Sequence, residues 1–264
     1  MKVCAAQLQP VAGDLAANTA KHIELIGLAV TQQADLLFFP ELSLTGYEPR
    51  LARTLAVDLA DPRLDVFQQF SDRNKIIIGL GMPVATGADV RIGMFWFAPG
   101  VPRRLYAKQQ LHVDEVPYFT PGDEQLVIES SGHRLAPAIC YESLRMDHAD
   151  RAAALSAEVY LASVAKSAGG LSKAMAHYPG VAQKHRMFVV MANCVGPNDN
   201  FLSVGRSAAW NTGGELLAQM DDASEGLVVL DIASGEARVH GLGKASEIDR
   251  HTIDRHGSPP DTPG

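Results

Sequence analysis

The sequence predicts a layered α/β fold, and three observations support this prediction. Short apolar runs that end at turn residues alternate along the chain with longer stretches of helical periodicity. Some of these runs, such as residues 36–39, are too short for a helix and stop at a proline, as buried strands do. The chain has 264 residues, 47% hydrophobic and 20% charged, so it can bury a large core without disulfides or metals.

In the first half of the chain, the pattern predicts two helices among strands. Apolar residues at spacings of three and four give residues 15–33 one apolar helical face. Three consecutive isoleucines favour a strand at residues 75–80. Residues 99–102, Pro-Gly-Val-Pro, are a turn signal that joins two strands in a hairpin. In chain order, the expected elements are a strand at 2–8, a helix at 15–33, a strand at 36–39, a helix at 61–73, a strand at 75–80, and hairpin strands at 90–98 and 103–111.

The second half of the chain continues the alternation. The expected elements are a strand at 135–140, a helix at 147–155, a strand at 157–164, a helix at 171–186, and strands at 187–192 and 227–232. Before residue 233 no linker or change in composition divides the chain, so residues 1–233 are predicted to form one domain. Residues 234–264 are polar and end in a Pro-rich segment. We expect them to form a C-terminal extension that is mobile or packs on a partner subunit.

Composition argues against nucleic acid and membranes as partners. There are 23 Lys and Arg against 30 Asp and Glu, a net charge of −7, and the longest basic run is the pair Arg103-Arg104. The apolar runs are shorter than the ~20 residues that span a bilayer. Polar Gln7 and Pro10 interrupt the first apolar stretch, so no export signal is expected. Three widely spaced cysteines fit reduced thiols, and we therefore expect a soluble cytoplasmic protein.

Three polar residues stand where predicted strands end, which is where α/β proteins commonly build sites. Glu41 follows an apolar run that raises its pKa and suits proton transfer, although alone it also fits a loop glutamate. Lys108 comes at the end of a hairpin strand, where a surface lysine is by far the more common case. Cys140 ends an apolar strand and could be a nucleophile or an inert buried thiol. Cys4 and Cys194 lie within apolar runs and are assigned to packing.

Other catalytic and cofactor patterns have little support. The nine histidines include no His-x-x-x-His pair, and the cysteines no Cys-x-x-Cys pair, so we expect no metal site. Glycine pairs occur without a phosphate-loop pattern, so we expect no nucleotide cofactor, and the Gly-x-Ser-x-Gly elbow is absent from the sequence. A Cys-His pair remains open, with His112, His133 or His177 as the base.

Three segments, taken in order, resemble the catalytic motifs of the nitrilase superfamily, the carbon-nitrogen hydrolases. They are Phe39–Tyr47, Tyr106–Leu111 and Ile139–Arg145, and their separations are also similar to those of the family. Further similarity extends over most of the chain, at Ala6–Leu8, Val189–Gly196, Gly205–Ser207 and Gly213–Leu217. The resemblance implies a four-layer α-β-β-α sandwich, a homodimer or higher homo-oligomer, and an amidase-like enzyme that needs no cofactor.

The resemblance also implies a role for particular residues. The catalytic triad of the family matches Glu41, Lys108 and Cys140. The backbone N–H of the residue after the nucleophile, Tyr141, is expected to help Lys108 hold the oxyanion. A further glutamate that positions the substrate best matches Glu115, with Asp114 as the competitor.

The expected reaction is hydrolysis of a C–N bond in a small carboxamide or N-carbamoyl compound, through a cysteine thioester and with release of ammonia. One alternative is a true nitrilase acting on a C≡N group, although such enzymes usually have Cys-Trp-Glu where this chain has Cys140-Tyr141-Glu142. Another is a catalytically idle ligand-binding homologue, since residues 181–186 depart from the family pattern.

Substrate preference cannot be transferred from relatives, because residues 162–167 replace a tryptophan-containing loop that is frequent in the family. Three cations are candidates to meet a substrate carboxylate, with solvated surface charge as the alternative for each. They are Arg50, Arg145 and Lys166.

Overall fold

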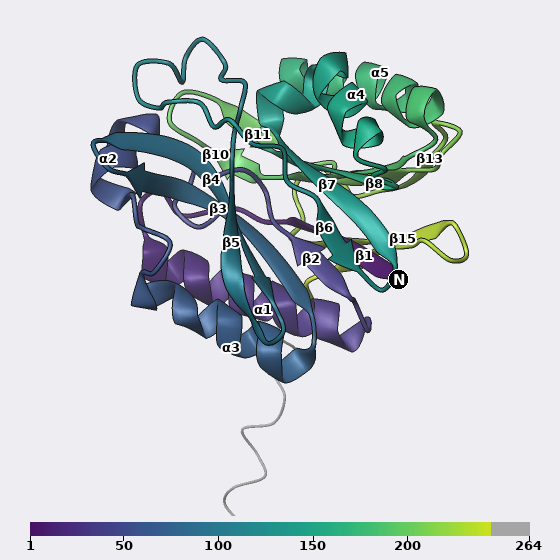
Figure 1. Ribbon diagram of the computed structural model, residues 1–264, viewed down its shortest axis with the longest axis horizontal. Helices are drawn as coiled ribbons and strands as arrows, with labels where there is room; N and C mark the ends of the chain where they lie inside the picture. Colours follow the sequence, from purple (N-terminus) through teal and green to yellow (C-terminus); the bar gives the residue numbers. More distant parts are fainter. Residues whose placement is uncertain (244–264) are drawn as a thin grey trace, which may run out of the picture.

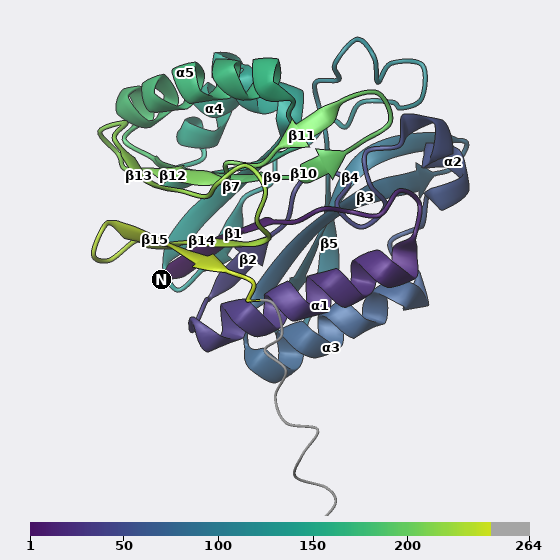
Figure 2. The ribbon, with the colours of Figure 1, turned by 180° about the vertical axis from the view of Figure 1, so that it is seen from behind.

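Two β-sheets lie face to face, and helices cover the outer side of each sheet (Figure 1). The structure, a computed structural model, describes residues 1–243. The helices α1 and α3 lie side by side under one sheet, and α4 and α5 lie over the other, in both the front and the back views (Figure 2). This arrangement is the α-β-β-α sandwich that the motifs imply, so the predicted fold class is confirmed.

The first sheet has seven strands in the order β15-β14-β1-β2-β3-β4-β5. The central strands β1, β2 and β3 are parallel, and the outer strands are antiparallel to their neighbours. The strands are β1 (Lys2–Gln7), β2 (Leu36–Phe38), β3 (Ile77–Thr86), β4 (Asp89–Ala98), β5 (Val101–Ala107), β14 (Gly226–Asp231) and β15 (Glu236–Gly241).

The second sheet has six strands in the order β13-β12-β9-β8-β7-β6, with β7, β8 and β9 parallel. Its strands are β6 (Ile128–Ser130), β7 (His133–Ile139), β8 (Val159–Val164), β9 (Phe188–Asn193), β12 (Ala208–Trp210) and β13 (Leu216–Gln219). A separate hairpin is formed by β10 (Val195–Pro197) and β11 (Leu202–Val204). The carboxyl ends of the parallel strands in both sheets lead into the loops that carry the predicted site residues.

The helices are α1 (Leu15–Thr31), α2 (Ala52–Leu55), α3 (Asp65–Asn74), α4 (Met146–Ala154) and α5 (Ala168–His185), with short 3₁₀ helices η1 (Pro49–Leu51), η2 (Pro62–Leu64) and η3 (Cys140–Leu144). Asp14 caps α1, because its Oδ1 accepts a hydrogen bond of 2.9 Å from the N–H of Ala17. Within residues 1–243, none of the helices is both long and apolar enough to cross a bilayer.

Apolar side chains from both sheets fill the space between them, and further clusters lie between each sheet and its helices. The central cluster includes Val3, Phe38, Leu135, Ile139, Leu161 and Val190. On the outer face of the first sheet, α1 and α3 contribute Leu25, Ile26, Ala29 and Phe67. On the outer face of the second sheet, α4 and α5 contribute Ala149, Ala152, Leu171 and Tyr178. Alternate strand residues thus supply the two faces of each sheet.

Two predicted strands end earlier than expected, and both ends lie at the site. The strand predicted over 103–111 stops at Ala107, because the N–H groups of Gln109 and Gln110 donate to the carboxylate of Glu142 rather than to a strand. The strand predicted over 135–140 stops at Ile139, and the next residue begins η3. Both departures replace ladder hydrogen bonds by contacts to a side chain or a helical turn.

The segment 234–264, predicted as an extension, includes a strand of the first sheet. Its residues 236–241 form β15, which pairs antiparallel with β14, so the hydrogen-bonded domain continues beyond residue 233. Residues 244–264, with the Pro-rich end, lie outside the described residues.

Gly81 on β3 packs against the loop that carries Glu41. A Cβ atom at this position would lie 2.5 Å from the backbone N of Leu42 and 3.0 Å from the carbonyl oxygen of Pro40. We expect Gly81→Ala to lower the free energy of unfolding by about 1–3 kcal/mol through overpacking. The control is Gly27→Ala in α1, where no atom lies within 4 Å of the added Cβ. Urea unfolding measures both, and equal stabilities for the two variants would contradict the expected clash.

Candidate active site

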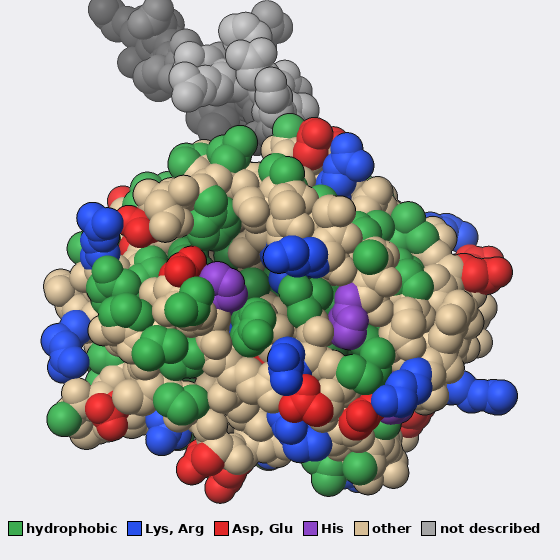
Figure 3. Space-filling model, turned by 90° about the horizontal axis from the view of Figure 1, so that it is seen from above, with side chains coloured by type: hydrophobic (Ala, Val, Ile, Leu, Met, Phe, Trp, Pro, Cys, Tyr) green, Lys and Arg blue, Asp and Glu red, His purple; other side chains and the backbone are tan. Residues whose placement is uncertain are grey.

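A cavity of about 580 Å³ opens above the carboxyl ends of the parallel strands. Its wall comes from the loops after β2, β5, β7 and β8 and from the turn between β10 and β11. Figure 3 shows a hollow near the middle of the face seen from above, bordered by basic and histidine side chains. The lining includes Tyr47, His112, Glu115, Cys140, Lys166 and Asp199.

Glu41 follows β2 and Pro40 and is buried. Its Oε1 accepts a hydrogen bond of 2.7 Å from Nζ of Lys108. Its Oε2 is buried without a hydrogen-bond partner among residues 1–243. Burial raises the pKa of the Glu41 carboxyl to about 7, while the Lys108 ammonium works against this shift. Glu41 can therefore gain or lose a proton near neutral pH.

Lys108 follows directly after β5 and is fully buried between two carboxylates. Its Nζ lies 2.7 Å from Oε1 of Glu41 and 2.6 Å from Oε1 of Glu115. Burial disfavours its charge, but the two carboxylates outweigh burial and raise the pKa of the Lys108 ammonium. Lys108 therefore keeps its positive charge inside the protein.

Glu115, rather than Asp114, belongs to this cluster. Both Lys108 and the hydroxyl of Tyr47 donate to Oε1 of Glu115, the latter at 3.1 Å. The N–H of His112 donates to Oε2 at 2.7 Å. The Asp114 side chain is 68% exposed and its nearest ionic partner is Nδ1 of His112 at 3.4 Å. The motifs leave Glu115 and Asp114 as alternatives for the fourth site residue. In the structure, Glu115 is the one that contacts Lys108.

Removing the charge of Glu115 is expected to damage turnover more than removing that of Asp114. Glu115→Gln weakens the ion pair that orients Lys108, and a misplaced group near the reacting atoms can cost about 100-fold in kcat. Asp114→Asn changes an exposed charge and should alter kcat by less than about twofold. Steady-state kinetics of both variants decide the ranking, and a larger loss in Asp114→Asn would transfer the role to Asp114.

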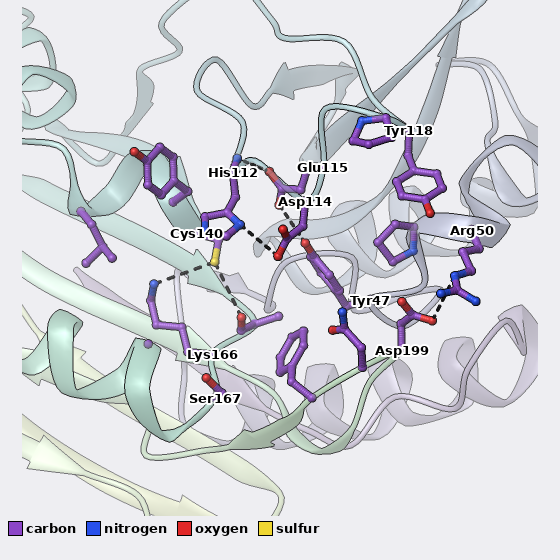
Figure 4. A pocket seen from close by; sticks show the side chains of 18 of the residues that line it. Tyr47, Arg50, His112, Asp114, Glu115, Tyr118, Cys140, Lys166, Ser167 and Asp199 are labelled. Carbon is purple, nitrogen blue, oxygen red and sulfur yellow. Dashed lines mark hydrogen bonds and ion pairs between the residues drawn. The ribbon is translucent and has the colours of Figure 1, made fainter.

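Cys140 begins η3 with a φ of 47°, in the left-handed region that a residue with a side chain rarely adopts. The turn is fixed because the hydroxyl of Ser143 donates to the Cys140 carbonyl at 2.6 Å and also contacts the hydroxyl of Tyr178. The thiol lines the cavity, with Sγ 3.7 Å from the carbonyl oxygen of Ala165 and 3.8 Å from Nζ of Lys166 (Figure 4). The strained turn thus presents the sulfur to the cavity.

Burial, reinforced by the nearby Glu41 carboxylate, raises the pKa of the Cys140 thiol to about 11. The ammonium groups of Lys166 and Lys108 oppose this rise. The resting thiol is therefore neutral, and it needs a base to become a nucleophile. The thiol also lies close enough to Glu41 to favour the ionised form of that carboxyl.

A buried carboxylate behind the site, Glu142, joins the loop of Cys140 to the loop of Lys108. Its Oε1 accepts from the N–H of Ile139 at 2.7 Å and from the hydroxyl of Tyr106 at 2.6 Å. Its Oε2 accepts from the N–H of Gln109 at 2.7 Å. Glu142 and Tyr47 both lie within the catalytic motifs, but their sequence context does not predict a role for either residue. Their contacts bridge distant segments, which local sequence patterns do not reveal.

The other cysteine and histidine candidates make no hydrogen bond to Sγ of Cys140 within residues 1–243. Cys4 and Cys194 are fully buried, as predicted for packing residues. His112 lines the cavity, but its imidazole ring contacts Asp114 and Tyr141, and His133 instead contacts Glu158. Among residues 1–243, no group of three or more His, Cys, Asp or Glu is arranged to hold a metal ion.

The three candidate cations for a substrate carboxylate have different positions. The Arg50 side chain is 75% exposed at the cavity rim, 3.9 Å from Asp199. Arg145 pairs with Asp147 outside the cavity lining. Lys166 is buried and points at Cys140 (Figure 4).

A sandwich of this kind places a cysteine beside a buried Glu-Lys-Glu cluster. The family model of carbon-nitrogen hydrolases matches residues 2–239. The chain belongs to the carbon-nitrogen hydrolase family, and the predicted family is confirmed.

Curated relatives fall into two groups. The glutamine-dependent NAD(+) synthetase of Aquifex aeolicus is 27% identical over 242 residues, which are 88% of this chain and 42% of that one. This chain spans less than half the length of the synthetases it matches. The (R)-stereoselective amidase of a Pseudomonas species is 29% identical over 246 residues, which are 88% of this chain and 85% of that one.

The fold is shared with the amidase of Nesterenkonia sp. AN1. One of its structures, in which acrylamide is added to the active-site cysteine, has a TM-score of 0.80 at 22% identity. The match covers 88% of this chain and 93% of that one. Another structure of the same amidase, in complex with butyramide, has a TM-score of 0.81 at 22% identity.

Proposed function

We propose that this chain is a thiol-dependent amidohydrolase that cleaves a small carboxamide or N-carbamoyl compound and releases ammonia. The observation that carries the proposal is the buried cluster of Glu41, Lys108 and Glu115 beside Cys140, which lines the cavity. Support also comes from relatives, since one curated relative is an amidase and the Nesterenkonia amidase binds butyramide.

In the first half of the reaction, Sγ of Cys140 attacks the carbonyl carbon while Glu41 accepts the thiol proton. The carbonyl π electrons move to oxygen. We propose that the Lys108 ammonium and the N–H of Tyr141 hold this oxyanion. Tyr141 is the second residue of η3, and the first N–H groups of a helix have no intrahelical acceptor. Donors placed in advance need no reorganisation when the negative charge develops on the oxygen.

In the second half, Glu41 returns its proton to the nitrogen, the C–N bond breaks, and ammonia leaves behind a thioester on Cys140. Glu41 then takes a proton from water, whose oxygen attacks the thioester carbon. When the C–S bond breaks, the sulfur recovers a proton from Glu41 and the carboxylic acid is released. The carboxyl group of Glu41 takes part in every one of these proton transfers. Its pKa, raised to about 7, suits both accepting and donating a proton.

Ammonia release tests this proposal over a panel of carboxamides, N-carbamoyl amino acids and nitriles. We expect release from carboxamides or carbamoyl compounds, and intact-protein mass spectrometry after rapid quenching should show an acyl group on Cys140. Release from nitriles alone would favour the true nitrilase. Neither release nor an adduct from any compound would favour the idle homologue.

We also propose that the chain acts in the cytoplasm as a homodimer on a small molecule. Its cysteines Cys4, Cys140 and Cys194 are free thiols, which suits a reducing compartment. Size-exclusion chromatography with light scattering measures the oligomeric state.

A further inference from the structure

Lys166 is a buried cation on the cavity wall that the proposed reaction does not use. It follows β8, and the residue is 4% exposed. Its backbone N–H donates to Oδ1 of Asn193 at 2.8 Å, which holds the loop in place. Figure 4 shows its side chain directed toward Cys140, with Nζ 3.8 Å from Sγ.

The ammonium of Lys166 has no carboxylate in ion-pair distance within the part of the chain that the structure describes. The two nearby carboxylates, Glu41 and Glu115, are engaged by Lys108 instead. The thiol that it contacts is neutral at rest. Burying a charge without a counter-ion costs free energy. A buried, unpaired lysine ammonium on a cavity wall is therefore expected where an anionic ligand binds and pairs with it.

We infer that Lys166 forms a subsite for an anionic group, and that the substrate amide carries a carboxylate on its acyl part. This inference rests on the proposed amidohydrolase function. The acyl part stays bonded to Sγ while ammonia departs, so a carboxylate a short aliphatic spacer away remains within reach of Nζ. Substrates of this class are monoamides of small dicarboxylic acids.

Further positively charged side chains at the cavity favour the binding of an anionic ligand. Lys173 and Arg50 stand at the exposed part of its lining, and Asp199 partly balances Arg50 at 3.9 Å. Asp114 faces His112 rather than Lys166. Lys166 differs from the two rim cations because it is desolvated, and a charge-assisted hydrogen bond formed there is stronger than at the surface.

Two amides that differ in one group test the inference. Succinamate carries a carboxylate where butyramide carries a methyl group. We expect a higher kcat/KM for succinamate, and we expect Lys166→Met to lower it roughly 10- to 100-fold more than it lowers kcat/KM for butyramide, because any effect through the thiol is common to both amides. The matched control is Lys184→Met, which removes an exposed cation of α5 outside the cavity lining and should change both substrates by less than about twofold.

A second readout does not depend on turnover. Iodoacetate and iodoacetamide both alkylate a thiol, but only iodoacetate is an anion. We expect the ratio of their rates at Cys140 to fall in Lys166→Met. If Lys166→Met slows both reagents equally, or lowers hydrolysis of both amides equally, Lys166 acts on the thiol and the subsite is refuted.

The two proposals fail in different ways. If the wild type hydrolyses amides without preferring succinamate and Lys166→Met has no selective effect, the subsite is wrong and the amidohydrolase stands. If no amide is hydrolysed but the alkylation ratio depends on Lys166, the anion subsite stands and the proposed reaction is wrong.

Discussion

Cys140→Ala is expected to abolish ammonia release, lowering kcat by about 10⁴-fold or more, as the loss of a catalytic nucleophile does in other hydrolases. Alanine has no atom that can form the thioester, and water in the cavity is a weaker nucleophile than the thiolate. The buried ion cluster remains in place, because it is formed by Glu41, Lys108 and Glu115 without Cys140. The variant should therefore bind an amide but leave it intact.

Two controls separate lost chemistry from lost folding. Cys4→Ala removes a fully buried thiol in β1, away from the cavity lining, and should keep kcat within about threefold. Thermal unfolding by circular dichroism should show that Cys140→Ala remains folded. A covalent acyl adduct seen in the wild type should be missing in Cys140→Ala and present in Cys4→Ala. Undiminished ammonia release by folded Cys140→Ala would rule out thiol catalysis.

Much of the fold could be predicted because local signals and tertiary demands agree. Residues 36–39 are apolar and end at Pro40, and the structure places β2 (Leu36–Phe38) in the buried centre of the first sheet. The helical periodicity of residues 15–33 corresponds to α1, whose Leu25, Ile26 and Ala29 face the sheet. Burial of one face produces such periodicity, so the sequence pattern reports it directly.

The strand β15 could not be predicted, because an edge strand leaves little trace in sequence. All six of its residues are at least partly exposed, and its apolar members, Ala237 and Val239, form too short an alternation to distinguish a strand from a polar tail. Its position comes from backbone pairing with β14, which polar side chains do not encode. The same polarity made residues 234–264 look like an extension.

At the site, motif order predicted which residues meet, but not the contacts that hold them. Glu41 and Lys108 meet although they are far apart in sequence, since both follow strands of the first sheet. Glu142 was missed because its four hydrogen bonds come from the loops around β5 and β7. Lys166 was left open between a ligand contact and the surface, because burial of one lysine depends on the packing of several loops.

Glu41→Gln is expected to lower kcat/KM by about 100- to 10,000-fold, the contribution typical of a positioned acid-base group. Glutamine keeps the size of the side chain but cannot accept the thiol proton. In the proposed mechanism, Glu41 acts as a base only when ionised, and burial raises its pKa to about 7. Below that pH, kcat/KM should therefore fall about tenfold per pH unit, whereas an exposed glutamate would place this fall near its usual pKa of about 4.3.

The pH profile identifies the titrating group when it is measured for the variant as well. Glu41→Gln should retain a small rate that lacks the acid limb near pH 7. Glu158→Gln, which changes a partly exposed glutamate paired with His133, should keep both the rate and the limb. The sign of this pH dependence follows from the proposed base role of Glu41. A raised pKa moves the fall in kcat/KM to higher pH, so activity should be lost in mild acid while the protein stays folded. An unchanged acid limb in Glu41→Gln would place the titrating base elsewhere, and the coupling of Glu41 to Lys108 would then serve only to orient the ammonium.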